Sequence, residues 1–217
     1  MNLFDLDGTL LDSNGIWQKI DEDFLAKRGL AWSEAYHAGV VHAIFPTAAK
    51  FTKDFCHLPE SEEEIMAEWM EMAYDAYSSY LPLKEGVRSY LTLLQRKGFP
   101  MAIYTACEPE LCQAALEHHG LTGMFEQILY ASQLGMEKRS PGAFAEVLRR
   151  LGVQAADCVF YDDSPLSCQG ARESGLTVVG VHDPLFADCA EEMRQICHRY
   201  IPSFDILTKP IVPASFV

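Results

Sequence analysis

Two acidic residues follow a short apolar run close to the first residue of the sequence. Asp5 and Asp7 are two positions apart, and Gly8 and Thr9 come directly after them. Side chains at alternate positions of an extended strand point to the same face, so these carboxylates are expected to project together as the strand ends. Two buried like charges repel and lose hydration, and a divalent cation is the simplest remedy. The stretch predicts a metal site; the alternative is an Asp-Gly hairpin turn with solvated acids.

Further polar residues follow later apolar runs of the chain. Thr105 ends one such run, Lys138 precedes a helical stretch, and Asp162 and Asp163 end another run. Each has a routine alternative: a strand-end hydroxyl, a solvated lysine, or acids that cap the next helix. Ligands of open parallel sheets bind at the carboxyl ends of the strands, where all these residues are expected. Their shared edge favours a functional site over four separate routine features.

The elements that must position these residues alternate along the second half of the chain. Helical spacing, glycine stops and apolar runs predict alternating helices and strands. This alternation predicts an α/β fold with a Rossmann-like parallel sheet covered on both faces. Ser140 with Pro141, and Ser164, are the expected starts of two helices. The helices are expected at 86–97, 109–119, 141–151, 165–174 and 187–199, and the strands at 101–104, 127–130, 158–161 and 176–181.

The block between the first strand and Leu81 favours helices throughout. Ser13 offers a capping side chain for a helix that begins near Ile16, and Ser61 with Glu64 fits a capping box. This block predicts an inserted all-α helical unit. The expected division is a core of residues 1–12 and 82–207, a helical domain of residues 13–81, and a tail of residues 208–217.

Four motifs resemble those of the haloacid dehalogenase (HAD) superfamily of phosphotransferases in order and spacing. They are FDLDGT, MAIYT, the lysine of EKRSPGAF, and VFYDDSP. The resemblance covers nearly the whole core, and the helical insert is similar to the α-helical cap of the phosphoglycolate phosphatase and β-phosphoglucomutase branch. It implies the HAD fold and phosphoryl-transfer chemistry.

The resemblance also implies a role for each residue. Asp5 would be the nucleophile, and Asp7 would carry the proton to the leaving oxygen; an acid at position 7 argues against the dehalogenase branch. Asp5, the backbone carbonyl of Asp7, and Asp163 would bind Mg²⁺. Asp162 would orient a metal-bound water, although the roles of Asp162 and Asp163 could be exchanged. The side chains of Thr105 and Lys138, with the backbone N–H of Ala106, would hold the phosphoryl oxygens.

Some positions depart from the family pattern. Ala106, Cys107 and Glu108 stand where relatives often carry Asn, Lys or Ser; Arg139 replaces a proline, and Ser167 replaces an Asp or Gly. These departures affect substrate contacts and metal coordination rather than the nucleophile. The helical unit would close over the site and read the leaving group. Trp17, Lys50 and Lys53 are candidate contacts within it.

Composition limits the classes of partner and compartment. The 217 residues carry a formal net charge of −14, which argues against a nucleic-acid or anionic-membrane surface. Seven cysteines without a C-x-x-C pair favour reduced thiols in a cytoplasmic protein. Met1 lies too close to the first strand for a signal peptide, and no apolar run is long enough for a membrane span. We expect a monomer or homodimer.

The leading functional hypothesis is a Mg²⁺-dependent phosphatase that acts on a small phosphorylated metabolite. A β-phosphoglucomutase-like sugar-phosphate mutase shares all four motifs and differs in shielding the phosphoenzyme from water. A non-catalytic binding protein on the same scaffold is the third hypothesis. The altered residues after Thr105 are its only support, and the Asp5–Asp7 pair opposes it.

Overall fold

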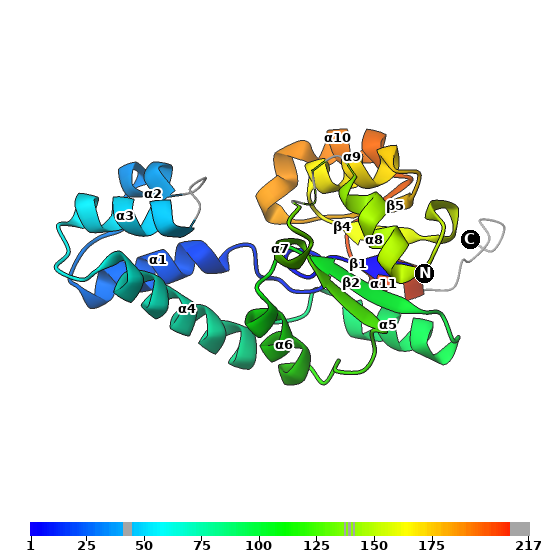
Figure 1. Ribbon diagram of the computed structural model, residues 1–217, viewed down its shortest axis with the longest axis horizontal. Helices are drawn as coiled ribbons and strands as arrows, with labels where there is room; N and C mark the ends of the chain where they lie inside the picture. Colours follow the sequence, from blue (N-terminus) through cyan, green and yellow to red (C-terminus); the bar gives the residue numbers. More distant parts are fainter. Residues whose placement is uncertain (41–44, 137, 139, 141, 209–217) are drawn as a thin grey trace, which may run out of the picture. The chain divides into compact units, whose positions relative to one another are not determined.

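A parallel sheet lies at the centre of the part of the chain that carries the four motifs (Figure 1). The computed structural model describes residues 1–40, 45–136, 138, 140 and 142–208. Within them the sheet has six strands in the order β3-β2-β1-β4-β5-β6, and every neighbouring pair is parallel. The strands are β1 (Asn2–Phe4), β2 (Met101–Thr105), β3 (Gln127–Tyr130), β4 (Val159–Asp162), β5 (Thr177–Val181) and β6 (Arg199–Ile201).

The first strand lies inside the sheet, between β2 and β4. Phe4 pairs with Ile103 on one side and with Tyr161 on the other. Strand order therefore reverses on the two sides of β1, and in open α/β sheets such a switch point opens a crevice at the carboxyl ends of the strands. The sequence places Asp5 directly at that crevice.

Alternate residues of the strands build two apolar layers. Leu3, Tyr104 and Phe160 belong to one buried cluster. On the other face, the ring of Phe4 stacks on that of Tyr161 with centroids 4.5 Å apart. The helices that pack around the sheet are α5 (Val87–Arg96), α6 (Pro109–His118), α7 (Ala131–Leu134), α8 (Ala143–Leu151), α9 (Pro165–Glu173), α10 (Ala190–Ile196) and α11 (Asp205–Thr208).

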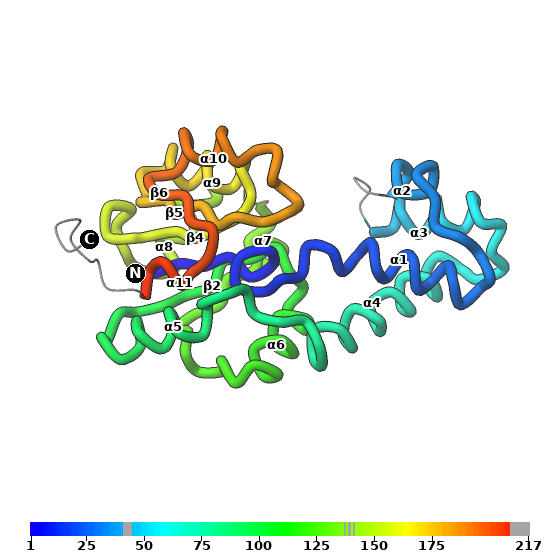
Figure 2. Tube along the Cα trace, turned by 180° about the vertical axis from the view of Figure 1, so that it is seen from behind, coloured from blue at the N-terminus to red at the C-terminus, as the bar shows by residue number. Residues whose placement is uncertain are grey.

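Residues Asn14–Tyr80 form a compact helical unit, separate from a second unit made of Met1–Ser13 and the chain from Leu81 onward. Its helices are α1 (Ile16–Lys27), α2 (Glu34–Val40), α3 (Phe45–Cys56) and α4 (Glu62–Ser79). Figure 2 shows α1 and α4 running side by side, where the rings of Phe24 and Trp69 meet at 5.6 Å between centroids. The predicted capping box of Ser61 and Glu64 is present.

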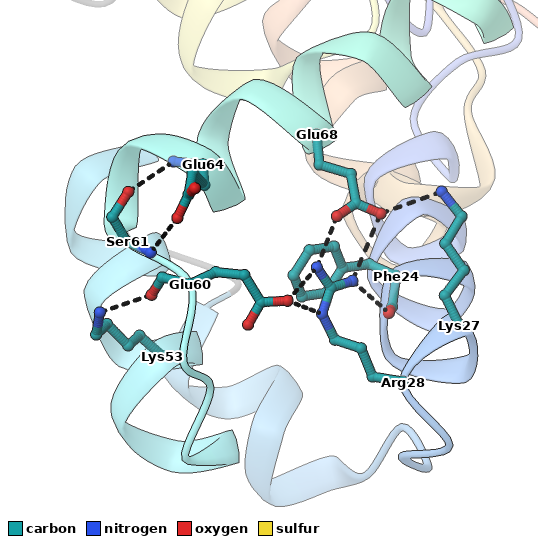
Figure 3. A network of polar contacts seen from close by, with 8 residues as sticks. All are labelled: Phe24, Lys27, Arg28, Lys53, Glu60, Ser61, Glu64 and Glu68. Atoms are coloured by element: carbon teal, nitrogen blue, oxygen red, sulfur yellow. Dashed lines mark hydrogen bonds and ion pairs between the residues drawn. The ribbon is translucent and has the colours of Figure 1, made fainter.

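A network of ion pairs and hydrogen bonds links three helices of this unit (Figure 3). Arg28 follows α1 and forms ion pairs with Glu60 at 2.9 Å and with Glu68 of α4 at 2.7 Å. Its guanidinium also lies 3.7 Å from the centroid of the Phe24 ring. Lys53 of α3 donates to the backbone oxygen of Glu60 at 2.6 Å. Arg28 and both the carboxylate and the backbone oxygen of Glu60 thus connect α1, α3 and α4.

Several predicted helix starts are wrong in detail. The N-cap of α1 is Gly15, and Ser13 donates to Asp7 instead of capping. Gly142, with a φ of 84°, is the N-cap of α8, so the helix begins after Ser140; Pro141 lies outside the described residues. Ser164 is the N-cap residue of α9, but its side chain makes no capping bond.

The helix predicted at 187–199 is confirmed only over its middle part, as α10. The predicted stretch begins within a 3-10 helix (Pro184–Cys189) and ends at the first residue of β6. Arg199–Ile201 was missed as a strand because three residues carry too little alternation to be detected, and pairing with β5 defines it. None of the described helices has the length and apolarity required to cross a membrane. The predicted tail lies outside the described residues from residue 209 onward.

Candidate active site

Three buried carboxylates meet at the carboxyl ends of β1 and β4. Oxygen atoms of Asp5, Asp162 and Asp163 all lie within 4.8 Å of one another. The backbone N–H of Asp5 donates to the carbonyl of Tyr161 at 2.9 Å, which continues the pairing of the two strands by one residue. Acids that are 157 positions apart in the sequence therefore face each other because β1 and β4 are neighbours in register.

The ammonium of Lys138 lies among these carboxylates. Its Nζ is 2.8 Å from Asp5 Oδ1 and 2.5 Å from Asp162 Oδ2, and the lysine side chain is 8% exposed. The same Nζ is 5.8 Å from the ring centroid of Tyr104 and 5.5 Å from that of Phe160. Aromatic faces at this distance favour a cation. Ion pairs and contacts with aromatic rings therefore hold the lysine. The structure places it at the carboxyl ends of the strands, where the sequence predicts it to lie.

The pKa values of the two buried partners follow from this geometry. Burial raises the pKa of Asp162, the charges of Asp5 and Asp163 raise it further, and Lys138 opposes them. Burial lowers the pKa of Lys138, but the carboxylates of Asp162 and Asp5 outweigh burial and raise it overall. Burial and the neighbouring acids thus raise the pKa of Asp162 despite its contact with the Lys138 ammonium.

Neighbouring donors fix the two acids that end β4. Thr9 Oγ1 donates to Asp163 Oδ1 at 3.0 Å. The backbone N–H of Ser164 donates to Asp162 Oδ1 at 2.8 Å. This bond, from the N-cap residue of α9, orients the Asp162 carboxylate.

Asp7 is not one of the three grouped acids, Asp5, Asp162 and Asp163. β1 ends at Phe4, so both acids of the first motif lie beyond the strand, and strand alternation alone does not orient Asp7. After it the chain turns at Gly8, whose φ is +70°. The hydroxyl of Ser13 donates to Asp7 Oδ1 at 2.6 Å. The carboxylate of Asp7 is therefore in a polar setting of its own, and its predicted metal contact through the backbone carbonyl stays a prediction.

The end of β2 supplies the hydroxyl on the other side of β1. Thr105 is fully buried, and its Oγ1 accepts a hydrogen bond from the backbone N–H of Cys107 at 3.0 Å. Ala106 between them is exposed. Burial, followed by the charge of the neighbouring Asp7, raises the pKa of the Cys107 thiol. Cys107 and Ser13 are contacts of Asp7 that sequence reasoning missed, because only the turn after Asp7 brings them to it.

The remaining predicted positions have other contacts or none that bear on the carboxylates. Lys50 pairs with Asp54 in the helical unit, and the ring of Trp17 meets that of Phe45. Ser167 is buried on α9. Arg139 lies outside the described residues. The predicted roles of Trp17, Lys50 and Lys53 as substrate contacts stay predictions.

The donor set suits a hard divalent cation. Three carboxylates face one ammonium among these four groups, which leaves an excess of two negative charges. Mg²⁺ prefers carboxylate oxygens and is typically held by one or two of them, together with water and phosphate oxygens. Asp5, Asp162 and Asp163 are the residues that could hold the ion.

Comparison with known proteins identifies the family. The sequence profile of the family described as haloacid dehalogenase-like hydrolase matches residues 2–181. The chain belongs to this family. It is 28% identical over 187 residues to the fructose-1-phosphate phosphatase YqaB of Escherichia coli, which covers 82% of this chain and 94% of that protein. The predicted superfamily and its class of enzyme, a HAD-type phosphoric monoester hydrolase, are confirmed.

Solved structures of this family share the fold. A protein of Thermotoga maritima, provisionally described as a β-phosphoglucomutase, gives a TM-score of 0.80 at 20% identity over 92% of this chain and 93% of that one. A HAD family hydrolase of Deinococcus radiodurans, solved with bound phosphate and sodium, gives 0.72 at 24% identity over 95% and 92%. At these identities the likeness shows the fold alone, and it confirms the predicted α/β HAD fold.

Proposed function

We propose that this protein is a Mg²⁺-dependent phosphatase that hydrolyses a small phosphomonoester through an aspartyl-phosphate on Asp5. The observation that carries the proposal is the convergence of Asp5, Asp162 and Asp163 within 4.8 Å of one another, with the ammonium of Lys138 paired to Asp5 and Asp162. The phosphatase name of the Escherichia coli relative supports the same class of substrate. The net charge of −14 disfavours a nucleic-acid substrate.

The chain's own groups divide the reaction into two steps. The Asp5 carboxylate attacks phosphorus in line, and the bond from phosphorus to the leaving oxygen breaks as the acyl phosphate forms. Asp7 gives its proton to the leaving oxygen. In the second step Asp7 takes a proton from water, and that water attacks phosphorus and restores the free Asp5 carboxylate.

The surrounding groups hold the charge of the phosphoryl oxygens. Lys138, Thr105 and the backbone N–H of Ala106 would bind those oxygens. Asp162 and Asp163 would hold Mg²⁺ together with Asp5, and the ion neutralises charge on the transferred phosphoryl group. Thr9 and the N–H of Ser164 keep the two β4 acids in place for this task. The helical unit would exclude bulk water and read the leaving group.

The test is phosphate release from a panel of phosphorylated metabolites with Mg²⁺. We expect steady release from at least one phosphomonoester and its loss when Mg²⁺ is chelated. Asp5→Asn should lower release by at least about a hundredfold, because the amide cannot form the acyl phosphate. Lys19→Met is the matched control, since Lys19 forms an exposed ion pair with Asp23 within α1.

Other results would redirect the assignment. Interconversion of a sugar 1-phosphate and its 6-phosphate without net phosphate release would establish the mutase instead. No turnover of any substrate, together with failure to bind beryllium fluoride and Mg²⁺ as an aspartyl-phosphate mimic, would favour a non-catalytic binding protein and refute the phosphatase.

A further inference from the structure

The ammonium of Lys84 is enclosed by three acceptors from distant parts of the chain. Its Nζ donates to the backbone oxygen of Gly8 at 2.8 Å, to that of His182 at 2.7 Å, and to Asp183 Oδ2 at 2.7 Å. The side chain of Lys84 is 12% exposed and that of Asp183 is 1% exposed. A lysine with so little exposure to solvent needs such partners, because burial removes the hydration of the ammonium and only hydrogen bonds and ion pairs can replace it.

These contacts hold the turn that follows the candidate catalytic pair. Gly8 comes directly after Asp7 and adopts a left-handed backbone. The backbone N–H of Lys84 donates to the carbonyl of Leu10 at 3.0 Å, so the same residue binds this turn by its main chain and by its side chain. The carbonyl of Pro82 accepts from Asp12 at 3.0 Å beside them. The segment that returns from the helical unit thus lies against the turn from Gly8 to Asp12.

The acceptors of Lys84 at the end of β5 are also held in place. His182 and Asp183 directly follow β5, and Asp183 Oδ1 accepts from the backbone N–H of Leu185 at 2.9 Å. The carboxylate of Asp183 therefore cannot turn away without losing a second hydrogen bond. Lys84 connects a strand end of the sheet to the turn after Asp7.

We propose that Lys84 is a positioning residue that fixes the Asp7 carboxylate for proton transfer by holding the carbonyl of Gly8. Lys84 does not contact the three-carboxylate group; it acts through the backbone adjacent to Asp7. This role rests on the proposed function, in which Asp7 protonates the leaving oxygen. The competing explanation is a buried ion pair that contributes only to stability.

The leaving group of the substrate separates the two explanations. An alkyl phosphate needs a proton on its departing oxygen, whereas p-nitrophenolate leaves well without one. We expect Lys84→Met to lower kcat for an alkyl phosphomonoester that the wild type turns over, about tenfold more than kcat for p-nitrophenyl phosphate. A stability defect would lower both rates by the same factor, because it changes only the amount of folded enzyme.

Arg88→Met provides the matched control. Arg88 lies in the same unit and donates to the backbone oxygen of His119 at 2.6 Å, away from the acids. It should leave the ratio of the two rates unchanged. If Lys84→Met does not fold, Lys84→Arg retains the charge but alters the three-acceptor geometry, and its rate ratio should shift in the same direction.

The outcomes are distinct. An equal loss with both substrates, or no loss, in the folded Lys84 variant overturns the positioning role and leaves the phosphatase in place. Absence of phosphate release from the wild type overturns the proposed function and, with it, the role of Lys84.

Discussion

Replacing Lys138 by methionine tests the electrostatic account of the site without reference to any substrate. The side chain is 8% exposed, and its Nζ lies 2.8 Å from Asp5 and 2.5 Å from Asp162. At an effective dielectric constant of about 20, each pair attracts by roughly 6 kcal/mol before desolvation is counted. Methionine keeps much of the apolar stem but leaves three carboxylates without the ammonium.

The net effect is smaller than the attraction, because the buried ammonium also loses its hydration. Removing one partner of a buried pair typically costs about 3–5 kcal/mol. We therefore expect Lys138→Met to lower the free energy of unfolding by about 3–5 kcal/mol at pH 7 in EDTA. Urea denaturation followed by circular dichroism measures it.

The effect should depend on pH and on added cation. Burial and like charges raise the pKa of Asp162 above its unfolded value, so the folded state retains this proton more readily. Stability from that group is present at low pH and is lost as pH rises through the folded pKa. The deficit of Lys138→Met should therefore shrink at acidic pH, and added Mg²⁺ should stabilise the variant more than the wild type.

Two results would refute this reasoning. One is an unfolding free energy for Lys138→Met within about 0.5 kcal/mol of that of the wild type at pH 7, which is the range of ordinary surface substitutions. The other is a deficit that does not change with pH or Mg²⁺. Lys50→Met is the control, because its ion pair is exposed and its loss should leave the free energy of unfolding close to that of the wild type.

Two further predictions concern the helical unit. Asp21 accepts from the hydroxyl of Tyr36 at 3.1 Å, and burial raises its pKa to about 6. The folded state thus retains this proton more readily, so the free energy of unfolding should fall by about 1 kcal/mol between pH 4 and 6, after allowance for solvent screening. In urea titrations the unfolding free energy of Asp21→Asn should not show this fall. A fall of the same size in the variant would contradict the assignment. Arg28→Met should destabilise the unit by about 2 kcal/mol in thermal unfolding at low salt, because two ion pairs and the Phe24 contact are lost. Lys19→Met, which removes an exposed ion pair, is the control. A loss for Arg28→Met no greater than that of the control would show that the network contributes little.

Local patterns in the sequence were sufficient for most elements of the sheet. Apolar runs between helices that end at glycines predicted five strands, because a buried parallel strand is largely apolar. The capping box at Ser61 was also readable, since both of its bonds are made within four residues. β6 was not readable, because it exists through its pairing with β5. The bond of Ser13 to Asp7 was not readable either, because it depends on the conformation of the turn between them.

The sequence by itself determined which chemical groups stand at the strand ends: Asp5, Asp7, Thr105, Lys138, Asp162 and Asp163. Side-chain type and the strand-helix alternation are local properties, so these residues and their shared edge could be predicted. Only the tertiary structure decided how they divide. It groups three acids, pairs two of them with Lys138, places Asp7 beside Ser13, and packs Lys84 against the turn after Asp7. The physical reason is that the acid group depends on the order of the strands, and the turn after Asp7 is held by Lys84, a residue more than seventy positions away.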